Sequence, residues 1–209
     1  MKWEEFLNRF AAMPFFHSSM LAIFNEDRPL IWVQLSRWVM AGKIARIRRG
    51  WYMIEKPWRA KEVPVPYIAT QIVQPSYLSL DWALQYYGLI PEGVPNPTCV
   101  TTDRPQRLQA LDRLFLYHHI QPALLTGFMQ VSIDGQNVPV ALAEKALFDK
   151  IYIHIQRNKF SLEWLRELRL QNLELLELER FASFADKTVK WGLEAAIRVT
   201  TEYIRKERR

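Results

Sequence analysis

The fold is decided by residues 30–54, which read LIWVQLSRWVMAGKIARIRRGWYMI. Apolar residues recur in the first half of this stretch at the spacing of one helix face: Ile31, Leu35, Trp38 and Val39. Gly42 follows, where a glycine commonly ends a helix. Residues 44–47 and 51–54 then read as two strands around a short turn that contains Gly50. The stretch therefore predicts a helix that leads directly into a small hairpin.

Two more helices are expected upstream of this stretch. Aromatic and aliphatic residues fall at helical spacing over 3–12, and a second helix is predicted over 17–24 beyond the interruption at Pro14. Three helices followed by a hairpin are the elements of a winged helix-turn-helix, which places one helix in the major groove of DNA. We predict such a domain over residues 1–56, followed by a proline-containing linker over 57–66.

The charge of this region favours a DNA partner. Between Arg28 and Lys61 the chain carries nine Lys and Arg residues against a single acid, Glu55, whereas the formal net charge of the whole chain is +6. A cationic block in one segment is typical of a surface that binds phosphates. A solvated surface without a partner is the alternative, and the coincidence of the block with the helix and hairpin favours DNA.

The predicted third helix offers base contacts. Burial of its apolar stripe turns Gln34, Ser36 and Arg37 outward. Arg37 and Gln34 have the bidentate geometry that reads guanine and adenine in the major groove.

The hairpin offers phosphate contacts. Lys43, Arg46, Arg48 and Arg49 are expected to cluster along the DNA backbone. Alternation along a strand predicts that Arg46 and Arg48 share one face. Trp51 is assigned to the same surface, where its indole either touches sugar or base edges or packs under the hairpin.

The remainder, residues 67–209, is predicted to be a mixed α+β domain with a helical C-terminus, because its helices and strands follow one another in mixed order with no βαβ alternation. Ser79 is expected to cap one helix. Strands are expected over 98–102, 115–120, 127–133 and 138–140. Helices are expected over 67–73, 80–87, 141–155, 161–170, 173–185 and 188–207.

Motifs of catalysis and cofactor binding are missing from the sequence. The seven glycines form no phosphate loop, and neither a G-x-S-x-G nor an H-E-x-x-H pattern is present. His118 and His119 are neighbours on a predicted strand, so one imidazole is expected to be buried and the other exposed, without a shared metal. Cys99 is expected to be an inert buried thiol. We therefore expect a protein that is not an enzyme, without catalytic residues, metal or cofactor.

One group of charges lies on a single predicted helix: Glu144, Lys145, Asp149 and Lys150. Charges three to five residues apart commonly pair along the solvated side of a helix, and this placement is expected here.

Four segments carry a family resemblance. They are residues 74–80, QPSYLSL; 83–92, ALQYYGLIPE; 100–102, VTT, followed by Arg104; and 140–149, VALAEKALFD. Together they resemble the AbiEi family of antitoxins from type IV toxin–antitoxin systems. Residues 42–52, GKIARIRRGWY, resemble that family's N-terminal winged helix, so that the resemblance covers about residues 1–155.

The resemblance implies a bacterial transcriptional autorepressor that binds inverted repeats of double-stranded DNA at its own promoter. It also implies an antitoxin that counters a nucleotidyltransferase-like toxin without forming a stable complex with it. A stand-alone winged-helix regulator, or a protein-interaction module without a cognate toxin, is the alternative. Since no apolar run approaches the roughly 18–20 residues of a membrane span, we expect a cytoplasmic protein with no membrane partner.

Overall fold

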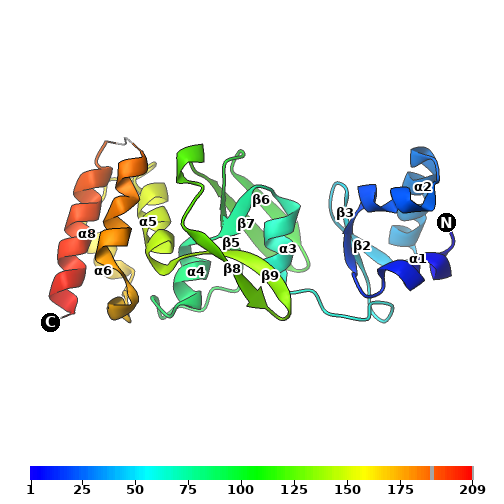
Figure 1. Cartoon of the computed structure of the whole chain (residues 1–209), viewed down its shortest axis with the longest axis horizontal. Helices are drawn as coiled ribbons and strands as arrows, with labels where there is room; N and C mark the ends of the chain where they lie inside the picture. Colours follow the sequence, from blue (N-terminus) through cyan, green and yellow to red (C-terminus); the bar gives the residue numbers. More distant parts are fainter. Residues whose placement is uncertain (189–190, 209) are drawn as a thin grey trace. The chain divides into compact units, whose positions relative to one another are not determined.

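The computed structural model describes residues 1–188 and 191–208. The chain divides into two compact units, Met1–Ile68 and Ala69–Arg209. Each unit combines helices with a sheet, so the α+β class expected from the sequence is confirmed (Figure 1).

The first unit places its elements in the order α1–β1–η1–α2–β2–β3. Their bounds are α1 Trp3–Phe10, β1 Phe15–His17, the 3₁₀ helix η1 Ser18–Phe24, α2 Arg28–Met40, β2 Ile44–Arg48 and β3 Trp51–Ile54. The predicted hairpin is present, since β2 and β3 pair antiparallel. Strand β1 was not predicted: it pairs antiparallel with the other side of β3 and completes a sheet of order β1-β3-β2.

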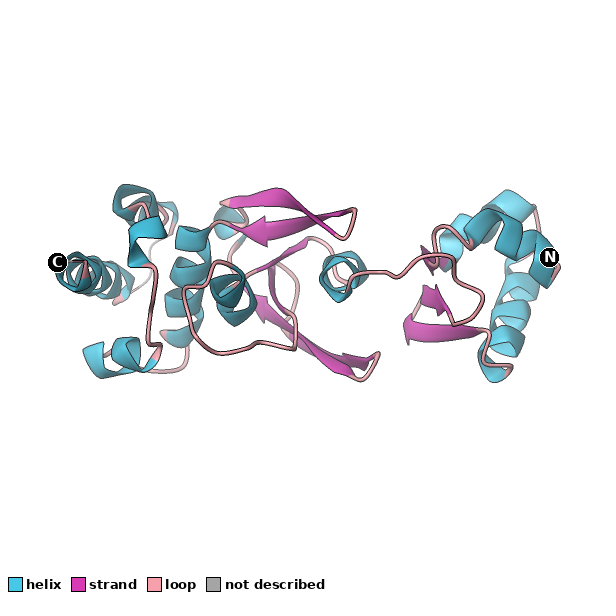
Figure 2. Cartoon of the chain, turned by 90° about the horizontal axis from the view of Figure 1, so that it is seen from below, coloured by secondary structure: helices cyan, strands magenta, loops and turns pink. Residues whose placement is uncertain are grey.

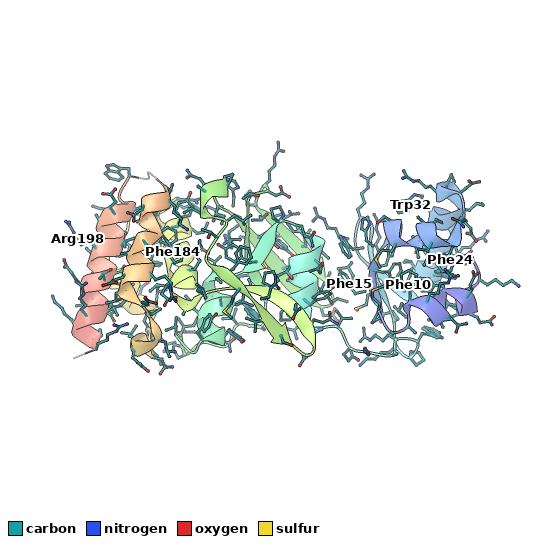
Figure 3. All side chains as sticks on the ribbon, viewed as in Figure 1. Phe10, Phe15, Phe24, Trp32, Phe184 and Arg198 are labelled. Atoms are coloured by element: carbon teal, nitrogen blue, oxygen red, sulfur yellow. The ribbon has the colours of Figure 1, made fainter. Side chains whose placement is uncertain are left out.

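Aromatic rings fill the interior of the first unit. Phe6 stacks on Phe10 with ring centroids 4.9 Å apart, and it lies 4.8 Å from the ring of Trp38. Phe24 reaches Phe10 from η1, at 6.2 Å between centroids (Figure 3). Such pairs contribute about 0.5–1.5 kcal/mol each beyond the burial of their area. The apolar stripe predicted on α2 packs into this interior, with Ile31, Leu35 and Trp38 buried and Val39 half-buried.

The second unit contains a mixed six-stranded sheet of order β6-β7-β5-β4-β9-β8. The strands are β4 Ser76–Leu78, β5 Thr98–Thr101, β6 Gln106–Ala110, β7 Arg113–His119, β8 Phe128–Ile133 and β9 Gln136–Ala141. Strands β5 and β7 pair parallel, as do β4 and β9, and the other neighbours pair antiparallel. Strands β4 and β6 were not predicted.

Helices surround this sheet and extend beyond it (Figure 2). They are α3 Val65–Ile72, which crosses the boundary of the two units, α4 Leu80–Tyr86, α5 Ala143–His154, α6 Leu162–Glu167, α7 Leu178–Ser183 and α8 Leu193–Glu207, with short 3₁₀ turns η2 Pro122–Leu124, η3 Leu173–Leu175 and η4 Ala185–Lys187. Helix α5 packs against α4, α7 and α8. The helix expected over 188–207 is observed as α8, and residues 189–190 of that expectation lie outside the described residues.

The expected cap of α4 is different in the structure. Ser79 occupies the position before the helix, but its hydroxyl donates to Asp149 at 2.7 Å and makes no cap bond. The backbone N–H of Trp82 instead donates to the hydroxyl oxygen of Thr98 at 3.0 Å. A residue from β5 therefore caps the helix, and Ser79 is free to bind the carboxylate.

The prediction that the charged side chains of α5 lie on its solvated side is also wrong. The side chains of Glu144, Lys145 and Asp149 are buried, and only Lys150 is partly exposed. The reason is that α5 is covered on several sides by α4, α7 and α8, so that its charged residues pair within the protein.

Candidate nucleic-acid interface

The outer face of α2 carries the predicted base-reading residues in part. Ser36 and Arg37 are exposed, whereas Gln34 is half-buried. Residues three or four apart share a side of a helix. Gln34 and Arg37 therefore lie on one side, and Ser36 lies with Trp32 on the other. Four large apolar side chains of α2 are also exposed, which its sequence did not lead us to expect: Leu30, Trp32, Val33 and Met40.

Lys43 lies away from the tip of the hairpin. Gly42 ends α2 with a positive φ of 65°, and the N–H of Lys43 donates to the carbonyl of Trp38 at 2.9 Å. The ammonium of Lys43 then sits 4.9 Å from the centroid of the Trp3 ring. Five residues of strand separate it from Arg48, about 16 Å at the usual rise. The structure thus does not bring Lys43 together with the tip cations.

A bulge in β2 changes the faces of its arginines. Arg46 is opposite Tyr52 in β3, but the register shifts before Arg48, which is opposite Trp51. Because Tyr52 and Trp51 are neighbours on one strand, they point to opposite faces. Arg46 and Arg48 therefore lie on opposite faces, and the prediction that they share one is wrong. The extra residue is Ile47, which is buried.

Trp51 packs against the sheet. Its ring stacks on Phe15 of β1, with centroids 4.7 Å apart and planes 7° apart, and it meets the imidazole of His17 edge-on at 5.1 Å. The indole packs under the hairpin and remains half-exposed, so its contact with sugar or base edges stays a prediction.

The hairpin tip contacts the start of η1. The N–H of Ser18 donates to the carbonyl of Gly50 at 2.8 Å. Gly50 has a φ of 85°, and a Cβ at this position would lie 2.5 Å from Nε2 of His17. A glycine is needed here both for the backbone conformation and for the close approach of the imidazole. His17 in turn accepts from the N–H of Ser19 at 3.3 Å.

A cavity of about 450 Å³ opens between η1 and the first turns of α2. Its lining includes His17, Ser19, Glu26, Arg28 and Trp32. None of these residues was predicted from the sequence to belong to the site. Only the pairing of β1 with β3 brings His17 beside the hairpin, and a three-residue strand leaves too short a pattern to be recognised.

Part of the cationic block is neutralised. Glu62 contacts Lys56 at 2.8 Å and Arg59 at 2.7 Å. The hydrogen bond from Lys56 is the largest of the interactions that lower the pKa of this carboxyl. Four arginines of the block form no ion pair within the described part of the chain: Arg28, Arg37, Arg46 and Arg49. These four lie on α2, β2 and the hairpin turn, and no acidic side chain of the described residues neutralises their charge.

A second polar cluster lies in the core of the other unit. The ammonium of Lys145 contacts the carboxylate of Asp149. The hydroxyls of Tyr77 and Ser79 donate to the same carboxylate at 3.0 and 2.7 Å. Burial and the neighbouring carboxylate raise the pKa of Tyr77, and burial lowers the pKa of Lys145.

This cluster joins two of the segments that carry the family resemblance. Tyr77 and Ser79 belong to QPSYLSL, whereas Lys145 and Asp149 belong to VALAEKALFD. The ammonium of Lys145 lies 5.6 Å from the ring centroid of Phe184. Both charged side chains are fully buried, and the cluster connects the end of β4 with α5.

The structure also shows the burial of the other titratable residues for which the sequence made a prediction. His118 is half-buried and His119 is exposed. Cys99 is buried, and burial raises the pKa of its thiol. Within residues 1–188 and 191–208, no three His, Cys, Asp or Glu side chains gather as a metal site requires. In the same ranges no helix combines the length and the apolar character needed to cross a membrane. Comparison of the sequence with protein-family models finds no match, and no curated protein matches it.

Proposed function

We propose that the chain is a DNA-binding transcriptional repressor whose first unit is a winged helix. The observation that carries this proposal is the order α1–β1–η1–α2–β2–β3, in which β1 closes the sheet against β3 and the cationic hairpin follows α2 directly. In this reading α2 enters the major groove and the hairpin is the wing.

The charges support this assignment. Arg37 is exposed on the proposed recognition helix, and Arg46 and Arg49 are exposed on the proposed wing. Since none of the three forms an ion pair within the described residues, binding of DNA phosphates requires no internal contact to be broken. Phosphate contacts of this kind supply most of the non-specific affinity for DNA.

The second unit is proposed to act as an antitoxin and not as an enzyme, and to counter a nucleotidyltransferase-like toxin without forming a stable complex with it. This role is supported by the hydrogen bonds and the ion pair that join Tyr77, Ser79, Lys145 and Asp149. These residues belong to two separate segments that resemble the antitoxin family, and the two segments contact each other in one cluster. Cytoplasmic DNA at the chain's own promoter is the proposed target, and a stand-alone regulator remains the second candidate.

The salt dependence of DNA binding tests the proposal. Full-length protein is titrated onto a promoter duplex at several salt concentrations, and log K is plotted against log salt. Arg46→Gln and Arg49→Gln should each reduce the slope by about 1, the value for one lost phosphate contact. Lys43→Gln is the matched control, because its ammonium lies over Trp3 at the other end of the strand. Slopes that are unchanged in Arg46→Gln and Arg49→Gln would contradict the assignment of the wing.

A further inference from the structure

A second positively charged site lies in the second unit. It is a cavity of about 270 Å³ between β6, β7 and the turn that follows α5. Arg107, Leu116, His118 and Arg157 are among the residues that line it. We call this cavity the β6–β7 pocket.

The sheet explains why these side chains converge. Arg107 of β6 is opposite Leu116 of β7, so both point to one face. His118 lies two residues beyond Leu116 and shares that face. Arg157 arrives from another part of the chain, in a turn whose N–H donates to the carbonyl of His154 at 3.1 Å. The two strands of one hairpin and a turn from a distant part of the sequence thus supply three basic groups to one pocket.

The basic groups of the β6–β7 pocket have no acidic partner. Within the described part of the chain neither Arg107 nor Arg157 forms an ion pair, and the His118 ring makes no hydrogen bond. Asp81, the carboxylate that acts on His118, is held by Lys150 at 2.7 Å. The net effect of these surroundings is to lower the pKa of His118, and burial of the imidazole is the largest cause. The positive charges of Arg157, Lys150 and Arg107 lower this pKa further, and the negative charge of Asp81 raises it.

We propose that the β6–β7 pocket binds the phosphate group of a small phosphorylated molecule, held by Arg107, Arg157 and His118. Guanidinium groups match the geometry of phosphate oxygens through paired N–H donors. The volume suits a phosphate with a small attached group, since ordinary ligand pockets begin at about 300 Å³. Leu116 gives the bound molecule an apolar wall. The site does not depend on the proposed function of the first unit.

Titration of the full-length protein with inorganic phosphate and with adenosine monophosphate tests the proposal, followed by two-dimensional NMR of backbone amides. We expect saturable shifts of the amides of residues 106–107, 116–118 and 157. Arg107→Gln and Arg157→Gln should each weaken binding about tenfold, the factor expected for one hydrogen bond to a charged group. Arg113→Gln is the matched control, an exposed arginine of β7 that donates to the carbonyl of Pro95.

Sulfate separates the role of His118 from general charge. This ion keeps two negative charges between pH 5 and 8, so only the protein titrates. Its affinity should rise as the pH falls through the pKa of His118, and His118→Gln should remove that rise while the variant keeps its fold.

Three results would overturn the proposal. They are shifts that do not saturate, an equal loss of affinity in Arg113→Gln, and a sulfate affinity that rises equally at low pH in His118→Gln. Displacement of bound phosphate by a DNA duplex, with no preference for adenosine monophosphate over phosphate, would reassign the pocket to a nucleic-acid backbone and would also overturn it.

Discussion

Lys145 and Asp149 form an ion pair across one turn of α5, and neither side chain is exposed to solvent. Removing charges from water is costly, and only close contact and further hydrogen bonds offset that cost. Both are present here. The carboxylate receives hydroxyl donors from Tyr77 and Ser79, and the ammonium is surrounded by aromatic rings, the nearest at 5.1 Å in Phe148.

The first prediction is that Asp149→Ala destabilises the protein strongly. The change leaves the ammonium of Lys145 buried without a partner, which typically costs about 3–5 kcal/mol. Since domains of this kind have a total stability of about 5–15 kcal/mol, the loss should be visible as a large shift of the urea midpoint.

The same helix provides the control for this prediction. Asp81→Ala removes the partner of Lys150, but that pair is partly exposed, at 24% and 37%, and its loss should cost at most about 1 kcal/mol. The double variant Lys145→Met, Asp149→Asn removes both charges and keeps an acceptor for Tyr77 and Ser79, so most of the stability should return. Equal losses in the two single variants would refute the importance of the buried pair.

The second prediction concerns pH. The pKa of His118 is below its ordinary value of 6.5 in the folded protein, so the unfolded chain binds a proton at a higher pH than the folded chain does. The free energy of unfolding should therefore fall as the pH drops from about 6.5 through the folded pKa. Unfolding in chloride buffers at pH 7.5 and 5.0 measures the effect. In His118→Gln the fall between these two values should be smaller, and an identical fall would show that the imidazole does not contribute.

The third prediction tests the contact between Gly50 and His17. Gly50→Ala should weaken DNA binding although it removes no charge, because a Cβ would meet the imidazole and displace the hairpin tip. Gly135→Ala is the control, since that glycine also has a positive φ, 76°, but has nothing within 4 Å of the added atom. The control therefore carries only the backbone strain, about 1–2 kcal/mol.

A second substitution isolates the steric contribution at this contact. Gly50→Ala should lose more stability than Gly135→Ala in thermal unfolding, because only Gly50→Ala adds the steric contact. Adding His17→Ala to Gly50→Ala should remove this additional loss. If Gly50→Ala and Gly135→Ala lose the same stability, the imidazole does not position the tip.

Most elements of the first unit could be predicted from its sequence, because the residues that end its helix and form its turn act locally. Gly42 ends α2 and Gly50 turns the hairpin at the expected positions. Strand β1 was missed because three residues after a proline are too short to show alternation. The bulge at Ile47 also left no signal, so the faces of Arg46 and Arg48 were assigned by a regular alternation that the strand does not keep.

The side-chain contacts of the second unit could not be predicted from its sequence, because they join residues that are distant in sequence. Asp149 binds Ser79, which lies 70 residues away, and no local pattern connects them. Charged residues on a helix predict exposure to solvent unless it is known which elements pack against that helix. Helices α7 and α8, from the C-terminal part of the chain, pack against α5. The same reasoning explains the β6–β7 pocket, whose arginines arrive from segments 50 residues apart.

The fourth prediction distinguishes sequence reading from phosphate binding on the proposed recognition helix. Arg37→Ala should reduce the preference for the promoter duplex over random duplex by about tenfold, because a bidentate contact to guanine contributes about 1–3 kcal/mol of discrimination. Arg49→Gln should weaken binding to both duplexes by the same factor. Competition binding at fixed salt measures the ratio, and equal losses on both duplexes in Arg37→Ala would remove this residue from base recognition.

The last prediction separates the two proposed roles within the intact chain. The variant Arg46→Gln, Arg49→Gln changes two exposed side chains of the first unit and leaves the buried cluster around Lys145 untouched. In cells that carry the nucleotidyltransferase-like toxin and a promoter reporter, this variant should lose repression and keep protection against the toxin. Asp149→Ala should lose both activities in proportion to the folded protein that remains, measured by immunoblot of the soluble chain. If the wing variant loses protection together with repression at a normal protein level, the antitoxin effect works through DNA binding. The second unit would then have no separate role against the toxin, and the chain would be a regulator alone.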